Sequence, residues 1–310
     1  MKVVALLNAA AGAVKNAPNY ALESRLANLF AKHGVAAEIV VVTQHELHKA
    51  AKAAARRAKL GKIDAVVAGG GDGSIRLVAS ALARSSIPLG VLPLGTLNHF
   101  AKDLGIPLDL DEAVGTIAKG ARRTIDLASV NGKFFVNNSS IGIYPYLVSD
   151  RDRLRKRHAL AKWLATIPAM LHTLREYPRK QLTIETKDWT KTYRTPCVFV
   201  GNNEYAMELT SLGRRKSLDE GKLFLYVVKQ RTPLGLFRAF LHLCLGRLDP
   251  KRDIERFELN KVTISSRATR LPVALDGDVG TMHPPLHYRS LPGALRVIVP
   301  RLEGHGNWRL

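Results

Sequence analysis

The stretch AVVAGGGDGS, residues 65–74, decides the fold of this chain. Four small or apolar residues of the kind that fill a buried strand lead into three consecutive glycines, and an Asp, a fourth glycine and Ser74 follow. Because glycine loses more conformational freedom on folding than any other residue, three in a row indicate that the backbone must approach something closely there. Ser74 starts a segment with apolar residues at helical spacing. The stretch therefore predicts a strand, a tight glycine turn and a helix.

Strands and helices alternate on both sides of this stretch. Apolar runs predict strands at 2–7, 36–42, 63–69 and 88–95, and apolar residues three and four apart predict helices at 21–34, 46–62, 74–86 and 96–107. Alternation of this kind is typical of a parallel sheet covered by helices. In such sheets ligands bind beyond the carboxyl ends of the strands, which is where the glycine turn lies.

The pattern changes after Ile125. The segment 125–143 holds two apolar runs around Asn131-Gly132, a pair that favours a hairpin turn. Short strand-like runs follow at 181–186, 193–202, 222–228, 261–266, 271–279 and 293–302, with helical segments at 151–178 and 233–246. We therefore expect an α/β domain of residues 1–125 and an antiparallel β-sandwich domain of residues 126–310, whose last strand can pack back on the first domain.

Composition narrows the class of protein. The 310 residues are 46% hydrophobic, which predicts a large core, and the formal net charge of +21 favours anionic partners. The sequence carries no nucleic-acid-binding motif, so we expect no nucleic acid partner. The amino terminus fits a first strand better than a signal peptide because Asn8 interrupts its apolar run, and no apolar run reaches the length of a membrane span. Two distant cysteines, Cys197 and Cys244, indicate reduced thiols in a cytoplasmic protein.

The glycine turn is suited to a phosphate. Glycines at a strand end let backbone N–H groups face an anion, and the helix that begins at Ser74 adds positive potential there. The carboxylate of Asp72 would repel a bare phosphate, so it either meets a magnesium ion or orients the loop. The turn has neither the spacing of a P-loop nor that of the dinucleotide-binding fingerprint. Taken alone, it is also compatible with a tight turn that binds nothing.

Two further motifs carry similar residues. LPLGTLNHFAKDLGIP, residues 92–107, follows the next predicted strand, and Gly95 and Thr96 offer a backbone N–H and a hydroxyl to another phosphate oxygen. Asn98 is placed to brace one loop against the other. ALDGDVG, residues 274–280, puts two carboxylates around a glycine at a late strand end, which a hairpin turn alone would also explain. Two glycine turns after adjacent parallel strands would form one crevice.

In this order, GGGDGS, LPLGTLNHFAKDLGIP and LDGDVG resemble the diacylglycerol kinase catalytic domain family, which includes bacterial soluble lipid kinases and sphingosine kinases. LLNAAAG, IDLASVNGKFFVNNSSIG and SLDEGKLFLYVV extend the resemblance over essentially the whole chain. The resemblance implies a Rossmann-like nucleotide-binding domain of the NAD kinase and diacylglycerol kinase type, followed by a β-sandwich domain that completes the lipid site. It implies transfer of the γ-phosphoryl group of ATP to the hydroxyl of a lipid, diacylglycerol or a related one.

The resemblance also implies roles for single residues. Asp276 would be the general base for the lipid hydroxyl, and Asp278 and Asp72 would bind Mg²⁺ directly or through water. Asp219 would be a side-chain ligand of a second, structural Mg²⁺. Phosphate or nucleotide contacts would come from Asn8, Thr43, Gly70, Gly71, Gly73, Ser74, Gly95, Thr96 and Asn98.

Three positions depart from the family pattern. Ala9 stands where the family has proline, His99 where it has aspartate, and Asp278 where it has glutamate. In the family, the aspartate at the second of these positions belongs to a magnesium and hydrogen-bond network. Asp103, one helical turn further on, is a candidate substitute.

A lipid kinase must reach a membrane. The predicted helix 151–178 starts with basic residues and continues with an apolar stripe that contains Trp163, a pattern that suits an anionic membrane surface or a core helix with a solvated end. We expect a cytoplasmic enzyme of phospholipid biosynthesis, peripheral to the inner face of the membrane, and the sequence leaves a homodimer open. Two other functions stay open: a kinase of a small soluble substrate such as NAD, and a nucleotide- or lipid-binding protein without turnover.

Overall fold

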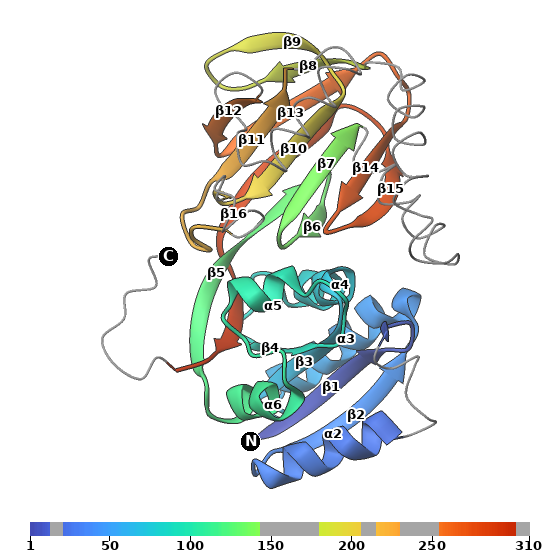
Figure 1. Cartoon of the computed structure of the whole chain (residues 1–310), viewed down its shortest axis with the longest axis vertical. Coiled ribbons are helices and arrows are strands. Elements are labelled where there is room, and N and C mark those ends of the chain that lie inside the picture. Colours follow the sequence, from blue (N-terminus) through green and yellow to red (C-terminus); the bar gives the residue numbers. More distant parts are fainter. Residues whose placement is uncertain (13–20, 143–179, 206–214, 230–253, 302–310) are drawn as a thin grey trace, which may run out of the picture.

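The computed structural model describes residues 1–12, 21–142, 180–205, 215–229 and 254–301. Figure 1 shows an α/β part that contains the amino terminus and, above it, a β part. The helices that the sequence predicts at 151–178 and 233–246 lie outside the described residues. Among the residues that are described, no helix is both long and apolar enough to span a membrane.

Four parallel strands form the centre of the α/β part (Figure 1). They are β1 (Lys2–Asn8), β2 (Ala36–Val42), β3 (Ala65–Gly70) and β4 (Leu89–Pro93), in the order β2-β1-β3-β4. The helices are α2 (Ala21–Lys32), α3 (Gln44–Lys59), α4 (Asp72–Leu82), α5 (His99–Asp103) and α6 (Leu110–Lys119). Because α3 packs with α4 on one face of the sheet and α2 with α6 on the other, β3 and β4 are buried along their whole length.

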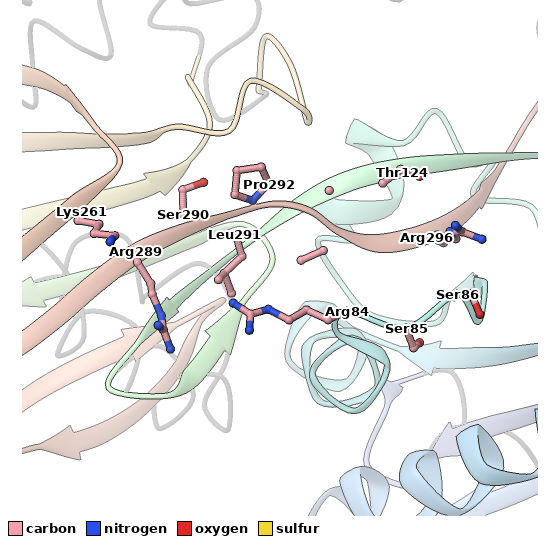
Figure 2. A pocket seen from close by; sticks show the side chains of 12 residues that line it. Arg84, Ser85, Ser86, Thr124, Lys261, Arg289, Ser290, Leu291, Pro292 and Arg296 are labelled. Atoms are coloured by element: carbon pink, nitrogen blue, oxygen red, sulfur yellow. The ribbon is translucent and has the colours of Figure 1, made fainter. Parts of the chain in front are cut away.

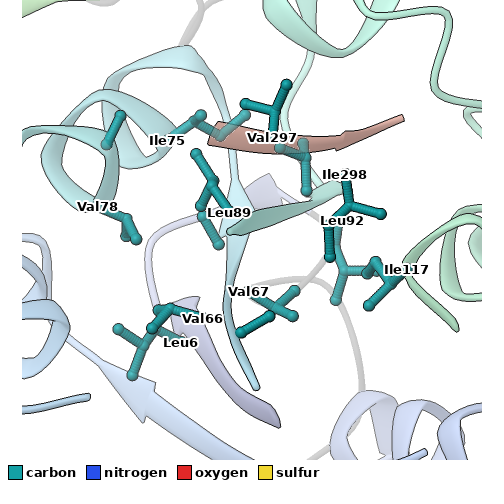
Figure 3. Close-up of a cluster of buried hydrophobic side chains, with 14 of the residues drawn as sticks. Leu6, Val66, Val67, Ile75, Val78, Leu89, Leu92, Ile117, Val297 and Ile298 are labelled. Atoms are coloured by element: carbon teal, nitrogen blue, oxygen red, sulfur yellow. The ribbon is translucent and has the colours of Figure 1, made fainter. Parts of the chain in front are cut away.

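The core of the α/β part also takes residues from the far end of the chain. Figure 3 shows the cluster to which the sheet and the helices α4 and α6 contribute Leu6, Val66, Val67, Ile75, Val78, Leu89, Leu92 and Ile117. Val297 and Ile298 lie in the same cluster, and neither is more than 3% exposed. The first domain therefore completes its core only with residues near the carboxyl terminus.

The β part contains two sheets. Its strands are β5 (Ala121–Val130), β6 (Lys133–Phe135), β7 (Asn138–Gly142), β8 (Lys180–Glu185), β9 (Thr190–Thr195), β10 (Cys197–Asn202), β11 (Leu223–Val228), β12 (Ile254–Leu259), β13 (Lys261–Ser266), β14 (Leu271–Leu275), β15 (Asp278–Met282) and β16 (Leu286–Val299). One antiparallel sheet has the order β12-β11-β10-β7-β14-β15, and β16-β13-β8-β9 belong to the other. Side chains from both sheets form a second core. The predicted fold class, an α/β domain followed by an antiparallel β domain, is confirmed.

The predicted hairpin at the start of the β part is also present. β5 and β6 pair antiparallel, with Val130 opposite Lys133. Asn131 and Gly132 between them have φ values of 46° and 79°. Two successive positive φ angles are those of the hairpin turn that matches the natural twist of the strands, which explains why the sequence has Asn-Gly there.

One long strand, β16, belongs to both parts of the molecule. It pairs with β13 near its start and with β5 along most of its length, while Val297 pairs in parallel with Leu89 of β4. The parallel sheet is thereby continuous with one sheet of the β part. The register between β16 and β5 shifts between Leu291 and Leu295, so residues 292–294 form a bulge where the strand passes from one part to the other.

Asp126 of β5 holds this bulge in place. Asp126 is 2% exposed. Its carboxylate accepts hydrogen bonds from the backbone N–H groups of Gly293 (2.8 Å) and Gly221 (2.6 Å) and from the side-chain amide of Asn203 (3.1 Å). A buried carboxylate is tolerated only when such donors compensate for lost hydration. The three bonds therefore tie β5 to the bulge of β16, to the residue after β10 and to the segment just before β11.

Replacing Asp126 with Ala should lower the free energy of unfolding by about 3 kcal/mol or more, because three donors lose their acceptor. Chemical denaturation followed by circular dichroism measures the change. Asp188→Ala, at an exposed position, is the matched control and should stay within about 0.5 kcal/mol of the wild type. Equal stability of the two variants would contradict this role for Asp126.

Candidate active site

Two glycine loops meet at the carboxyl ends of β3 and β4. The two strands are neighbours in the sheet, and Gly71 follows one while Gly95 comes shortly after the other. A Cβ atom on Gly95 would overlap the Cα atom of Gly71 and would lie 2.8 Å from Oδ1 of Asn98. Only glycine therefore fits at position 95. The structure brings together the two loops that the sequence predicts to form one crevice.

Asn98 fixes the second loop from inside. It has a φ of 51°, in the left-handed region that Asn tolerates, and is 6% exposed. Its Oδ1 accepts the N–H of Gly95 at 3.0 Å, and its Nδ2 donates to the carbonyl oxygens of Pro93 and Gly95. The sequence predicts that the N–H of Gly95 faces a phosphate. In the structure this N–H is instead bonded within the loop, to Asn98. Asn98 braces its own loop, while the exposed Thr96 lies on the same loop.

The carboxylate of Asp72 connects the first loop to the second. It accepts the backbone N–H groups of Phe100 (2.8 Å) and His99 (3.2 Å) at the start of α5, and the side-chain amide of Asn137 (3.3 Å). N–H groups at the start of a helix have no acceptor within the helix, so a carboxylate there is stabilising. Of the two uses that the sequence leaves open for Asp72, orienting the loop is the one seen. His99 contributes its backbone N–H to this contact.

Asn8 and Ser74 join the end of β1 to the start of α4. Nδ2 of Asn8 donates to Oγ of Ser74 at 2.7 Å, and Oδ1 of Asn8 accepts the N–H of Ala10. Asn8 and Ser74 are each 5% exposed. A Cβ atom on Gly70 would lie 2.7 Å from Oγ of Ser74, so the glycine lets the two elements approach. The first N–H groups of α4, at positions 72 and 73, have no acceptor within the helix and suit an anion.

Asp278 reaches the glycine loop from the second domain. Its Oδ2 accepts Nη2 of Arg76 in α4 at 2.8 Å and Nε2 of Gln44 in α3 at 3.2 Å. A Cβ atom on Gly73 would lie 2.6 Å from the same oxygen, which places this carboxylate against the first turn of α4. The Asp-Gly-Asp motif and both glycine loops therefore lie in one site, although most of the chain separates this motif from the loops.

Asp276 is buried beside this contact. It is 8% exposed and has a φ of 48°. Its Oδ2 accepts the backbone N–H of Val136 at 2.8 Å, and its Oδ1 accepts those of Asn137 (2.7 Å) and Asn138 (3.0 Å). Burial raises the pKa of Asp276 to about 6, although the three N–H groups and the positive charge of Arg76 act to lower it. The carboxyl group therefore titrates close to neutral pH and has a fixed orientation.

Arg215 links the same backbone segment to the first domain. Its fully buried guanidinium donates from Nε to Oδ2 of Asp103 at 2.8 Å, from Nη1 to the carbonyl oxygen of Val136 at 2.7 Å, and from Nη2 to Oδ1 of Asn137 at 3.0 Å. Asn137 in turn donates to Asp72. Asp103, which the sequence offers as a substitute for the family aspartate of the magnesium and hydrogen-bond network, is the buried partner of Arg215 and is connected through Arg215 and Asn137 to Asp72. A role of Asp103 toward magnesium stays a prediction.

Sequence reasoning missed Arg215 and Asn137. Arg215 lies in the run Arg214-Arg215-Lys216, within a chain that has 47 Lys and Arg residues, so nothing marks it as buried. Asn137 is the first of two adjacent asparagines in a segment whose pattern predicts only a hairpin at the domain junction. The pairing of each with a residue of the first domain depends on long-range contacts that have no local pattern.

Thr43 stands at the border of the site. Its N–H and its hydroxyl both contact Oε2 of Glu46, at 3.2 Å and 2.7 Å, which caps the start of α3. The following residue, Gln44, contacts Asp278. The nucleotide contact predicted for Thr43 stays a prediction.

Asp219 forms an ion pair with Arg123, away from the residues of the glycine loops. Its carboxylate contacts Nη2 of Arg123 at 3.0 Å and accepts the hydroxyl of Ser217 at 2.7 Å. Partial burial raises the pKa of Asp219, but Ser217 and Arg123 outweigh this and hold it below the usual value. In the part of the chain that the structure describes, no three or more His, Cys, Asp or Glu side chains group as metal ligands. The structural Mg²⁺ predicted at Asp219 stays a prediction.

Comparison with known proteins agrees with this geometry. Residues 2–130 match the diacylglycerol kinase catalytic domain, and residues 149–299 match the YegS C-terminal NAD kinase beta sandwich-like domain. A diacylglycerol kinase of Bacillus subtilis (strain 168) is 28% identical over 80% of this chain and 82% of its own length. The Pseudomonas aeruginosa protein "Probable lipid kinase YegS-like" is 32% identical over 76% of each chain. An uncharacterized protein of Synechocystis sp. is 28% identical over 76% of this chain, which spans 54% of that protein.

Solved structures show the same fold. A crystal structure of a diacylglycerol kinase from Bacillus anthracis superposes with a TM-score of 0.69 at 22% identity and covers 96% of both chains. The two matched domains together cover most of the chain, and in the P. aeruginosa relative the match extends through more than two thirds of both proteins. The chain belongs to the diacylglycerol kinase catalytic domain family of lipid kinases and carries the YegS-type C-terminal domain.

Proposed function

We propose that this protein transfers the γ-phosphoryl group of ATP to the hydroxyl of a lipid, diacylglycerol or a related lipid. One observation carries the proposal: Asp278 of the second domain lies against the first turn of α4, where the two glycine loops meet. A phosphate donor at the loops and an acceptor hydroxyl beside Asp276 would then share one site. Phosphoryl transfer depends mainly on positioning and on neutralising charge, and this site offers both.

The phosphates of ATP would lie on the glycine loop. The start of α4 and the backbone at Gly71 and Gly73 would face them, with Thr96 on the second loop. Asn8, Ser74 and Asn98 would act by holding the loops in shape, since their polar groups bond within the loops. Arg76 adds a positive charge in the same region.

A magnesium ion bound with ATP would neutralise phosphate charge. Asp278 fits such an ion because its carboxylate is partly exposed and its contacts from Arg76 and Gln44 both fall on Oδ2. Asp72 fits less well as a direct ligand, since both its oxygens already accept N–H groups of α5. Magnesium in proteins commonly keeps several waters and takes one or two carboxylates besides phosphate oxygens.

Asp276 would take the proton from the lipid hydroxyl. A pKa of about 6 leaves this carboxylate mostly ionised at neutral pH, and a base with a pKa near the working pH is effective. The three backbone N–H groups hold the carboxylate in one orientation. The lipid would come from an anionic membrane surface, to which a protein with a net charge of +21 is attracted. We place this reaction in the cytoplasm, in phospholipid biosynthesis.

Purified full-length protein with γ-labelled ATP and a panel of acceptors tests the proposal. The panel contains diacylglycerol, a sphingoid base, phosphatidylglycerol and NAD. We expect label in a lipid and none in NAD. Label only in NAD would indicate a kinase of a soluble substrate, and bound ATP without transfer to any acceptor would indicate a binding protein. Either result would contradict the proposal.

Replacing Asp276 with Asn should reduce kcat by about 10²–10⁴-fold, because the acceptor of the hydroxyl proton is lost. In the wild type kcat should fall as the pH drops below about 6, where Asp276 becomes protonated, and the variant should lack this dependence. Asp188→Asn is the matched control. Since Asp276 also binds three N–H groups, a thermal melt must show that the variant is folded. An unchanged pH profile in a folded variant would exclude Asp276 as the base.

Arg76→Gln provides a second test of whether Asp276 is the base. A purely structural role of Asp276 would not produce the expected result. The positive charge of Arg76 lowers the pKa of Asp276, so its removal should raise that pKa. The acid limb of the kcat profile should therefore move to higher pH. A limb that stays in place would show that the titrating group is not Asp276.

Gly95→Ala should separate the two glycine loops, because its Cβ would overlap Gly71. We expect at least tenfold weaker ATP binding, measured by calorimetry without any lipid. Gly280→Ala is the matched control, since no atom lies within 4 Å of a Cβ there and its φ is not positive. Equal ATP affinity of the two variants would show that the loop contact is not needed for nucleotide binding.

A further inference from the structure

We propose that a pocket at the bulge of β16 binds the phosphate group of a second ligand, apart from the candidate active site. The pocket has a volume of about 590 Å³. Figure 2 shows its side chains, which come from the loop after α4 and from β5, β13 and β16. They are Arg84, Ser85, Ser86, Thr124, Lys261, Arg289, Ser290, Leu291, Pro292, Gly293, Ala294 and Arg296.

The lining of this pocket is strongly basic. Four of the residues are cationic, Arg84, Lys261, Arg289 and Arg296, and none is acidic. Within the described ranges of the chain, none of the four forms an ion pair. Figure 2 shows Arg84 extending from the α4 side toward Arg289 and Leu291 of β16. An anion between the two domains would satisfy charges that the protein itself leaves without a counter-charge.

Two local features of the pocket are energetically unfavourable in themselves. Lys261 and Arg289 stand directly opposite each other in the β13–β16 pair, and like charges in that arrangement repel. Arg84 has a φ of 59°, whereas the four other described non-glycine residues with positive φ are all Asn or Asp. Residues that contradict local preferences in this way gather at functional sites.

A hydroxyl group in the pocket also lacks a partner. Oγ of Ser290 is buried, and no hydrogen bond to it is found among the residues that the structure describes. Leu291, Pro292 and Ala294 add apolar surface. A volume in the range of small-molecule sites leaves room for a phosphate ester rather than a bare phosphate ion alone.

The pocket lies at the opposite end of α4 from the glycine loop. The loop precedes Asp72, the first residue of this 11-residue helix, while Arg84 comes two residues after its last. Eleven residues of α-helix span about 16 Å, so one phosphate cannot occupy both places. The carboxyl end of a helix is slightly negative, but four cations outweigh this partial charge. The backbone N–H of Arg84 donates to the carbonyl oxygen of Ala294 at 2.7 Å, which ties this end of α4 to the bulge.

Calorimetry without ATP tests the proposal. Inorganic phosphate and glycerol 3-phosphate are titrated into the full-length wild type, the pocket variant Arg84→Gln/Arg289→Gln, and the control Arg267→Gln/Arg270→Gln. The control removes the same two charges at exposed positions outside the pocket. A second arm measures sedimentation of the three proteins with vesicles of phosphatidylcholine alone or with phosphatidylglycerol. The glycine loop is intact in all three, so its own affinity for phosphate cancels.

We expect the pocket variant to bind at least tenfold more weakly than the control in one arm. Loss with the soluble anions identifies a soluble phosphate ester, and loss only with phosphatidylglycerol vesicles identifies a lipid headgroup. Equal affinities of the pocket variant and the control in both arms would overturn the proposal. If thermal melts show the double variant to be unfolded, Arg296→Gln replaces it with the same two readings. No result depends on turnover, so failure here is separate from failure of the proposed kinase activity.

Discussion

The carboxylate of Asp276, bonded to three successive backbone N–H groups, is the interaction on which the site depends. The segment 136–138 that it holds runs from the end of β6 into the first residue of β7, and each of its residues makes a further contact. The carbonyl oxygen of Val136 accepts Arg215, and the side chain of Asn137 bridges Arg215 and Asp72. Asp72 in turn holds the start of α5. A carboxylate of the second domain is therefore connected, through Asn137 and Asp72, to the two glycine loops.

Two ion pairs join the domains near the site. The pair of Asp103 and Arg215 is almost fully buried, whereas in the pair of Arg76 in α4 and Asp278 the carboxylate is partly exposed. A buried ion pair contributes little net stability, because the loss of hydration offsets the attraction, but removal of one partner is severe. The ion pairs here act mainly by orienting side chains, because the hydrogen bonds between the charged groups are directional. The ion pairs of Asp103 with Arg215 and of Arg76 with Asp278 thus connect the two domains in a defined orientation.

The sequence predicts the fold better than the contacts at the site. The alternation of strands and helices and the Asn131-Gly132 turn follow from local preferences, so they were predicted correctly. The convergence of the glycine loops follows from strand adjacency. The use of the N–H of Gly95 by Asn98, and the pairing of Asp103 with Arg215, could not be predicted, because they depend on side-chain directions and on contacts across more than a hundred residues. Asp72 shows the same limit: its position in the sequence allows it to bind a metal ion or to orient the loop, and the contact with the N–H groups of α5 depends on the fold.

Because β16 belongs to both parts of the molecule, it affects how the chain folds during its synthesis on the ribosome. The amino-terminal domain of most multidomain chains folds while the rest is still being translated. Here the neighbour of β4 in the sheet, and part of the core around Leu89, come from residues 286–299. A nascent chain that has released only the first domain exposes an unpaired sheet edge and an unfilled core until β16 has also been synthesised. Ribosome-bound intermediates of this protein are therefore expected to need protection by chaperones, and loss of the last strand would damage the domain encoded first.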